Sequence, residues 1–258
     1  MDYNNKESLQ LLQRIKKEIQ MKLIFIRHGE PDYSIDSLTE KGWREAELLS
    51  LRTAKWNVTD FYCSPLGRAR DTASLTLKKA GRKAVTLEWL REFDAPIWDD
   101  MMKRRKVPWD FYPEFMTVHP ELFDLNRWQE NPVMAEGRAG EEYQRVCTEL
   151  DSLLKDYGYI RENYRYRTSS QTKNDAVIVC FCHLGITCAL LSHLINTTPS
   201  QLWQGFFLAP TSVTVIGTEE RTPTEAYFRC QVMGDTSHLL MGGEPVSYYG
   251  YFTEPFQG

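Results

Sequence analysis

The stretch MKLIFIRHGE (residues 21–30) places a short apolar run directly before an arginine, a histidine and a glutamate. Residues 23–26 are apolar throughout, a pattern typical of a buried parallel strand. The charged residues that follow then lie at the carboxyl end of that strand, where α/β sheets bind their ligands. The stretch therefore predicts an α/β fold and the sheet edge at which its chemistry takes place.

Strand and helix patterns alternate along the rest of the chain. Further strands are predicted at 60–63, 84–87, 176–182, 213–216 and 226–232. Helices are predicted at 39–51, from Ser64 as N-cap and Pro65 as first helical residue to about 79, at 140–157, at 185–195, and after a capping box at 198–201. Residues 158–175 are expected to form a polar loop and residues 241–258 an irregular tail. The alternation favours a three-layer α/β/α sandwich with a mostly parallel central sheet.

Two segments fall outside this alternation. Residues 95–138 are rich in aromatic residues and prolines, which predicts an inserted cap of short helices and turns. Residues 6–19 carry leucine and isoleucine at helical spacing, so residues 1–20 are expected to be an N-terminal helical extension. Residues 21–258 then form the main domain.

Composition excludes several functional classes. Hydrophobic residues make up 42% and charged residues 26% of the 258 residues, as in ordinary globular proteins. The net charge of −4 provides no basic field for a nucleic acid, and the longest apolar run, 176–182, is too short to cross a membrane. The polar N-terminus does not fit a signal peptide, and the 6 scattered cysteines indicate reduced thiols, so a cytoplasmic location is expected.

Polar residues follow the carboxyl ends of several predicted strands. Arg27 and His28 follow the first strand, Arg68 lies in the helix after the second, Glu92 comes after the third, and His183 follows the strand 176–182. Because parallel strands end at one edge of the sheet, we expect these five side chains to lie close together.

Such a group of side chains suits phosphoryl transfer. Two guanidinium groups bind phosphate oxygens in a bidentate way, and a helix N-terminus after Ser64 adds partial positive charge. A neutral imidazole can attack phosphorus, a second imidazole can donate to the phosphate oxygens, and a carboxylic acid can protonate the leaving alkoxide. None of these steps requires a metal or another cofactor.

These residues stand in motifs that resemble those of the histidine phosphatase superfamily, the phosphoglycerate mutase-like group. Arg27-His28-Gly29 matches the hallmark motif of that family. Further matches follow in the family's order: Asp36, Leu38, Thr39, Gly42 and Ala46; Ser64-Pro65 with Arg68 to Ala73; Leu90-Arg91-Glu92; and Gly234 to Leu239. The resemblance covers most of residues 21–240, apart from the aromatic insertion.

The resemblance implies a role for each candidate residue. His28 is implied to be the nucleophile that becomes phosphohistidine, and Glu92 the proton donor. Arg27, Arg68 and His183 are implied to bind the phosphate, and His183 is also counted among the catalytic residues. The implied activity is metal-independent hydrolysis of a small-molecule phosphomonoester by a phosphatase of the histidine acid phosphatase type, with residues 21–258 as the catalytic domain. The sequence does not decide whether the chain forms a homodimer.

Two departures from the family pattern bear on the site. Leu184 stands where the family usually has a glycine directly after its second histidine, and a leucine there can narrow the pocket or displace His183. After Glu92 the chain lacks the Gly-rich segment that the family often carries. Asp94 and Glu30 are therefore alternatives for the acid.

Three further motifs in the chain admit more than one interpretation. Cys180-x-Cys182-His183 with Cys188 invites a metal site, but no second pair has zinc-like spacing, so small buried hydrophobic residues are favoured. Ser64 lacks the G-x-S-x-G elbow of a serine hydrolase. The basic run 103–106 is interpreted as a solvated face, with a site for a second phosphate as the alternative.

Two other functions are left open by the sequence. One is phosphoryl transfer of the phosphoglycerate mutase type. The other is a catalytically inactive module that binds a phospho-ligand or a protein, keeping Arg27 and Arg68 but lacking turnover.

Overall fold

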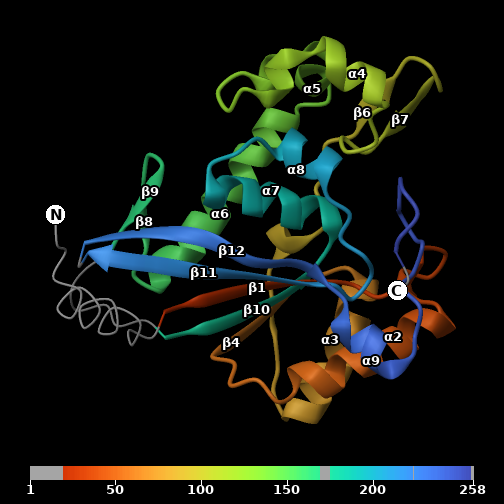
Figure 1. Ribbon diagram of the computed structural model, residues 1–258, viewed down its shortest axis with the longest axis vertical. Helices are drawn as coiled ribbons and strands as arrows, with labels where there is room; N and C mark the ends of the chain where they lie inside the picture. The colour runs from red at the N-terminus through yellow and green to blue at the C-terminus, as the bar shows by residue number, and fades with distance from the viewer. Residues whose placement is uncertain (1–19, 169–174, 223, 257–258) are drawn as a thin grey trace, which may run out of the picture.

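The computed structural model describes residues 20–168, 175–222 and 224–256. The predicted helical extension at 1–20 lies, apart from residue 20, outside these residues. The main sheet of the described part has eight strands in the order β5-β4-β10-β1-β11-β12-β9-β8 (Figure 1). In that order their bounds are Val85–Thr86, Asp60–Cys63, Val177–Cys182, Lys22–Arg27, Val213–Thr222, Glu225–Asp235, Arg165–Arg167 and Ile160–Glu162.

The apolar run after Met21 forms β1 in the middle of this sheet. It pairs in parallel with β10, placing Arg27 beside Cys182, and antiparallel with β11, placing Ile26 beside Val213. The strands β5, β4, β10 and β1 are parallel to one another, whereas β11, β12, β9 and β8 add an antiparallel half. The centre is therefore parallel, as predicted, with hairpins completing one side.

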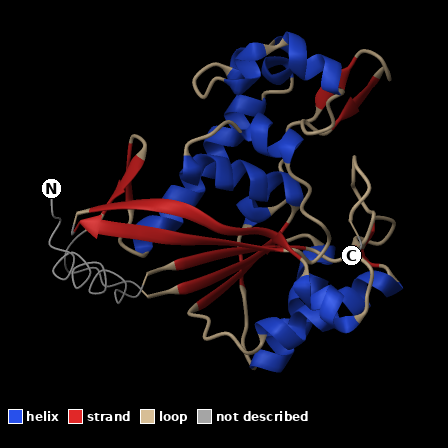
Figure 2. Cartoon of the chain, in the orientation of Figure 1, coloured by secondary structure: helices blue, strands red, loops and turns tan. Residues whose placement is uncertain are grey.

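Helices cover both faces of the sheet (Figures 1 and 2). The helices α2 (Glu40–Thr53) and α3 (Gly67–Ala80) lie on one face, with α9 (Ser237–Gly242) packed on α2. The helices α6 (Ala139–Asp156), α7 (Leu184–Ile195) and α8 (Pro199–Gly205) lie on the other face. Alternate side chains of β1 supply the two cores, Leu23 and Phe25 to one and Ile24 and Ile26 to the other. The predicted three-layer α/β/α fold is confirmed.

The inserted segment forms a cap above α7 and α8 (Figure 1). It contains the short helices α4 (Pro113–Val118) and α5 (Pro132–Glu136) and the 3-10 turns η2 (Pro120–Phe123) and η3 (Trp128–Glu130). It also contains a hairpin of β6 (Ile97–Asp99) and β7 (Arg104–Lys106), which the sequence pattern did not show. Trp109 and Trp128 each place their rings 6.2 Å from that of Trp203 in α8, so aromatic packing holds the cap on the body.

Two expectations about local structure were wrong. The helix after β4 begins at Gly67 with Leu66 as its N-cap, not at Pro65 with Ser64 as N-cap, and the Ser64 hydroxyl contacts both the N–H of Leu66 and the ring of His183. Residues 158–175 were expected to be a loop, but β8 and β9 form a hairpin within them. In β9 the buried Tyr166 alternates with the exposed Arg165 and Arg167, and the strand pairs with β12 on one side and with the edge strand β8 on the other.

The basic run 103–106 is only partly the solvated face that was expected. Lys103 is exposed and pairs with Asp100 at 3.3 Å, and Arg105 pairs with Glu136. Lys106, however, is buried: its ammonium lies 2.8 Å from the carboxylate of Asp99 and over the rings of two aromatic residues. This lysine serves the cap's own packing.

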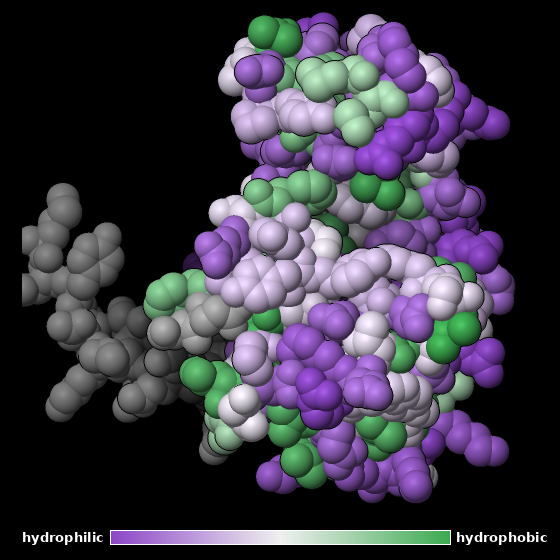
Figure 3. All heavy atoms as spheres, turned by 90° about the vertical axis from the view of Figure 1, so that its right-hand side faces the viewer, coloured by the Kyte–Doolittle hydropathy of each residue, from purple (hydrophilic) through white to green (hydrophobic). Residues whose placement is uncertain are grey.

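Figure 3 shows the molecule from the right-hand side of Figure 1. Polar and charged residues dominate this face, and hydrophobic patches interrupt it, one of them where the cap meets the body. Among the residues that the structure describes, no helix combines the length and the apolar character needed to traverse a bilayer.

We expect Gly185→Ala to destabilise the protein, because a Cβ atom there would lie 2.3 Å from Cζ3 of Trp109 and 2.8 Å from Oε1 of Glu92. Overpacking of this kind lowers the free energy of unfolding by about 1–3 kcal/mol. Urea denaturation measures it. Gly205→Ala is the matched control, since no atom lies within 4 Å of its added Cβ. Equal effects of the two substitutions would contradict the argument.

Candidate active site

His28 sits at the end of β1 with its backbone tied to both neighbouring segments. Its N–H donates to Cys182 O at 3.0 Å, and its carbonyl accepts from the N–H of Thr211 at 3.1 Å. The ring Nδ1 lies 2.7 Å from the carbonyl oxygen of Gly29. Because a carbonyl only accepts, Nδ1 carries the proton, and Nε2 keeps its lone pair.

The surroundings of His28 keep this imidazole uncharged. The side chain is buried, and burial is the main cause that lowers its pKa well below the usual value. The guanidinium groups of Arg27 and Arg68 lower the pKa further. A neutral imidazole with a free Nε2 is a nucleophile over the whole neutral range.

His183 is the N-cap residue of α7 and lies against His28, with 5.1 Å between the ring centroids. Its Nε2 is 2.7 Å from Oγ of Ser64. That oxygen also accepts from the N–H of Leu66 at 3.2 Å, and when the Ser64 hydroxyl donates its own proton to Nε2, Nδ1 carries the ring proton. Burial, followed by His28 and the arginines, lowers the pKa of His183 well below its usual value. The role of Ser64 was missed in the sequence, where Ser-Pro suggested a helix cap.

Hydrogen bonds from the Nη atoms of each arginine to oxygen atoms of the protein fix the orientation of its guanidinium group. Nη1 of Arg27 donates to the carbonyl of Leu208 at 2.5 Å, and Nη2 donates to the carbonyl of Tyr249 at 3.4 Å. Nη1 of Arg68 donates to Asp36 at 2.6 Å, and the other oxygen of Asp36 accepts from the backbone at the start of α3. Asp36, which the motif match included without a role, is therefore a positioning residue.

Three buried ring or guanidine nitrogens around His28 have no hydrogen-bond partner among the described residues: Nε of Arg27, Nε of Arg68 and Nδ1 of His183. A buried donor without an acceptor costs about 1–3 kcal/mol. The oxygens of a phosphoryl group accept hydrogen bonds from such donors. The group therefore has the chemistry of an anion site next to a nucleophile.

Glu92 follows the 3-10 turn η1 (Glu88–Leu90) and is held by backbone amides. Its Oε1 accepts from the N–H groups of Phe93 at 2.8 Å and Ile186 at 2.9 Å, and its Oε2 accepts from Gly185 at 3.3 Å. Gly185 and Ile186 lie in the first turn of α7, where backbone N–H groups have no partner within the helix, so the start of that helix supports the carboxyl group. Burial nevertheless raises the pKa of Glu92, outweighing the hydrogen bonds and the attraction of Arg27. The carboxyl group therefore keeps its proton to higher pH than usual.

The alternative acids are placed less favourably. Asp94 is exposed. Glu30 uses one oxygen to accept from Thr39 at 2.9 Å and the other to accept from Ser247 at 2.6 Å. Of the three carboxyl groups, Glu92 is the one that accepts hydrogen bonds from the first turn of α7, which follows His183.

Leu184 does not separate the two histidines. Its side chain is buried in the core cluster on the α6–α7 face of the sheet, and His183 remains in contact with both His28 and Ser64. The expected displacement of His183 by this leucine is not seen.

The loop after His28 is fixed from below by α3 and α2. The N–H of Gly29 donates to Thr72 at 2.9 Å, and the N–H of Glu30 donates to Glu45 at 2.8 Å. Glu45 is buried, which raises its pKa to about 7 despite the hydrogen bond and the nearby Lys41.

The described part of the chain contains no group of three or more His, Cys, Asp or Glu side chains that could hold a metal ion. Cys180, Cys182 and Cys188 are buried, and burial is the main cause that raises the pKa of each thiol. They pack as small apolar residues.

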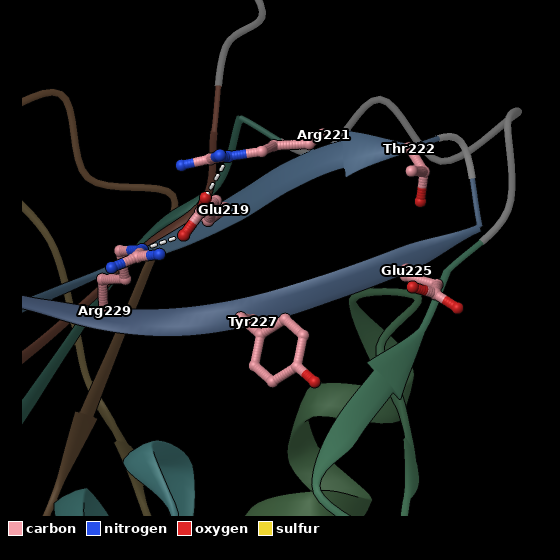
Figure 4. Close-up of a pocket in the computed structure, with 6 residues that line it drawn as sticks. All are labelled: Glu219, Arg221, Thr222, Glu225, Tyr227 and Arg229. Atoms are coloured by element: carbon pink, nitrogen blue, oxygen red, sulfur yellow. Dashed lines mark hydrogen bonds and ion pairs between the residues drawn. The ribbon is translucent and has the colours of Figure 1, made fainter.

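A separate surface hollow of about 280 Å³ lies between β11 and β12 (Figure 4). Its lining residues are Glu219, Arg221, Thr222, Glu225, Tyr227 and Arg229. Glu219 pairs with both Arg221 and Arg229, and together with Glu225 the lining carries two negative and two positive charges. The hollow lies toward the end of the hairpin opposite Val213, which pairs with Ile26 beside the candidate site.

Residues 23–231 match the histidine phosphatase superfamily (branch 1). The chain belongs to this superfamily. It is 27% identical over 210 residues to phosphoserine phosphatase 1 of Hydrogenobacter thermophilus, covering 78% of this chain and 88% of that protein. A shorter match, 35% identical over 79 residues, joins it to a 2,3-bisphosphoglycerate-dependent phosphoglycerate mutase of Thermoplasma acidophilum, covering 27% of this chain and 40% of that protein.

Solved structures share the fold. Bacillus stearothermophilus YhfR is 24% identical, with a TM-score of 0.55, and the alignment covers 85% of this chain and 99% of that one. A phosphoserine phosphatase of Entamoeba histolytica, solved with 3-phosphoglyceric acid, is 21% identical with a TM-score of 0.54 and the same coverage. Superfamily membership, together with the phosphoserine phosphatase relative, supports a phosphatase-type enzyme.

Glu45→Gln should stabilise the protein at alkaline pH. The pKa of Glu45 is about 7 in the folded protein and 4.5 ordinarily, so the folded state binds this proton more tightly and the free energy of unfolding falls as pH rises from 4.5 through 7. Glutamine keeps an oxygen for the N–H of Glu30 without the charge. At pH 8 the variant should be more stable by on the order of 1–3 kcal/mol, and at pH 4 the gain should vanish.

Urea denaturation across this pH range measures the difference. Glu47→Gln is the matched control, because Glu47 lies on the same helix but is half exposed and pairs with Lys79 at 2.9 Å. A stability gain for Glu45→Gln that does not depend on pH would sink the electrostatic explanation.

Proposed function

We propose that this protein is a metal-independent phosphatase that hydrolyses a phosphomonoester through a phosphohistidine on His28. The observation that carries the proposal is the neutral imidazole of His28 with its free Nε2, next to Arg27, Arg68 and His183, each of which has a buried nitrogen without a partner among the described residues. A nucleophile inside an anion site suits attack on phosphorus.

In the first step, Nε2 of His28 attacks phosphorus, and the bond between phosphorus and the ester oxygen breaks. The three nitrogens bind the equatorial oxygens, whose charge they stabilise in the transition state. Glu92 gives its proton to the leaving alkoxide, which departs as an alcohol. The raised pKa of Glu92 keeps that proton available.

In the second step, water attacks the phosphohistidine. The Glu92 carboxylate takes a proton from the water, the bond between phosphorus and Nε2 breaks, and inorganic phosphate leaves. Nε2 regains its lone pair, and Glu92 regains its proton. Each residue thereby returns to its starting state.

The rival functions have less support. The match to the phosphoglycerate mutase covers 27% of the chain, against 78% for the phosphoserine phosphatase. An inactive binding module would not need a neutral, orientated imidazole beside the anion site. A small-molecule substrate, a cytoplasmic location and the absence of nucleic acid and membrane partners stay predictions from the sequence.

His28→Ala should abolish turnover. We expect hydrolysis of 4-nitrophenyl phosphate to persist in EDTA and to fall about 10³-fold or more in the variant, because the variant lacks the imidazole that forms the phosphohistidine. His119→Ala, in the cap, is the control and should keep activity, since its ring contacts Phe115 and Glu121 rather than the site. Brief reaction with labelled substrate should leave an acid-labile, alkali-stable label on the wild type alone. Activity that survives His28→Ala would refute the mechanism.

Glu92→Gln should slow the hydrolysis of alkyl phosphates far more than the hydrolysis of 4-nitrophenyl phosphate. Nitrophenolate leaves without protonation, whereas an alkoxide needs an acid, which contributes about 10²–10⁴-fold. With an alkyl substrate, the wild-type rate should fall as pH rises through the raised pKa of Glu92, and the variant should lack that limb. If both substrates are slowed equally, Glu92 is a structural support of α7 instead.

A further inference from the structure

Two tyrosines stand over the arginines of the candidate site. The Tyr33 ring lies over the Arg68 guanidinium, with 5.1 Å from Cζ to the ring centroid. The Tyr249 carbonyl accepts from Arg27, and its ring lies 5.5 Å from that of Tyr33 with a tilt of 56°. Tyr33 is 57% exposed and Tyr249 is 40% exposed, whereas the arginines beneath them are buried. The Tyr33 ring thus covers Arg68 on its solvent side, and Tyr249 adjoins both Arg27, through its carbonyl, and the Tyr33 ring.

The tail residue Tyr249 is held in this position by a set of polar contacts. Glu244 accepts from Lys41 at 2.7 Å and from Arg44 at 2.9 Å, which ties the start of the tail to α2. These partners hold the pKa of Glu244 at about 2. Further along, Ser247 donates to Glu30 at 2.6 Å and accepts from the N–H of Tyr249 at 3.1 Å. The tail therefore presents Tyr249 as a fixed part of the site.

The close approach of the tail to Arg27 supports the same view. A Cβ atom on Gly250, whose φ is +77°, would lie 3.1 Å from Nη2 of Arg27. The left-handed φ and the missing side chain let the backbone lie directly against the guanidinium. The tail and the loop after β1 meet over the site from opposite ends of the chain.

The two segments that carry the pair also expose further apolar side chains. These are Ile35, Tyr248, Tyr251, Phe252 and Phe256, which alternate with exposed polar residues such as Ser34, Thr253 and Glu254. Tyrosine offers a large, rigid contact area at low entropy cost, and two rings at this tilt provide both a face and an edge to a third ring. An organic group attached to a phosphate bound by Arg68 would lie within reach of the Tyr33 ring, which lies over the Arg68 guanidinium.

We infer that Tyr33 and Tyr249 select phosphomonoesters whose leaving group carries an aromatic ring. This inference rests on the proposed function, since it names the substrate class of the same site. The phosphoryl group is bound by the buried nitrogens, and the ring of the leaving group packs against the tyrosine pair. Small phosphorylated acids would bind less well, because their leaving groups have no ring to pack against the two tyrosines.

Direct binding of two phosphonates tests the inference without turnover. Phenylphosphonate and methylphosphonate carry the same anionic group and differ in the ring, and neither has an ester bond to cleave. Calorimetric titration of the wild type should show phenylphosphonate binding about tenfold more tightly or better. Equal affinities would overturn the inference.

Substitutions of Tyr33 and Tyr249 test whether their rings cause the preference for phenylphosphonate over methylphosphonate. Tyr33→Leu and Tyr249→Leu should each reduce the ratio of the two affinities about threefold to tenfold, and Tyr33→Phe should keep it, because the ring remains. Glu244→Gln should reduce the ratio as well, since it weakens the attachment of the tail. Tyr227→Leu is the matched control: Tyr227 is 47% exposed on β12, away from the site, and its loss should change nothing. A ratio that the leucine variants leave unaltered would also overturn the inference.

Turnover then separates this inference from the proposed function. Selective binding without hydrolysis of any phosphomonoester would refute the phosphatase and keep the binding preference. Hydrolysis of phosphoserine and phosphotyrosine with no change in their relative kcat/KM in Tyr33→Leu would refute the preference and keep the phosphatase. Comparing free phosphotyrosine with a phosphotyrosyl peptide distinguishes a small aryl phosphate from a phosphorylated protein as the source of the ring. A higher kcat/KM for either than for phosphoserine, lowered in Tyr33→Leu, supports the inference.

Discussion

The parallel pairing of β1 with β10 is the interaction on which the rest of the site depends. Arg27 lies beside Cys182 in the register of these strands, and the N–H of His28 donates to the carbonyl of Cys182. The two strands therefore end at the same level, and the residues that follow them, His28 and His183, place their rings 5.1 Å apart. A shift of one residue in this register would turn each side chain to the opposite face of the sheet and separate the pair.

Burial and positive charge act together on these histidines. Removal from water lowers the pKa of both imidazoles, and the arginines lower it further, so neither ring is protonated in the neutral range. The same burial raises the pKa of Glu92. The same surroundings thus favour an uncharged imidazole on His28 and a carboxyl group on Glu92 that keeps its proton to higher pH than usual, as the proposed first step requires. The cost is a set of buried donors without protein acceptors, which a phosphoryl group can satisfy.

Much of the arrangement followed from local sequence patterns, but the contacts that orient it did not. The strand runs before Arg27 and His183 are apolar and short, and they identified the sheet edge. Ser64 was expected to cap a helix, yet its hydroxyl is bonded to His183. The tail after residue 241 was expected to be irregular only, yet Ser247 and Tyr249 contact Glu30 and Arg27. In each case the two hydrogen-bonded residues are more than a hundred positions apart in the sequence. The periodicity of hydrophobic residues does not predict such a pair.

The sequence by itself determined the fold class, the order of the main strands and helices, and the residues gathered at the edge of the sheet. It could do so because hydrophobic periodicity and parallel strand order are local properties with one spatial consequence. Only the tertiary structure decided which nitrogen of His28 is free, which carboxyl group is supported by α7, and which aromatic residues stand over the arginines. Those features depend on hydrogen bonds and burial that arise when distant segments pack together, because the dielectric environment and the available partners exist only in the folded chain.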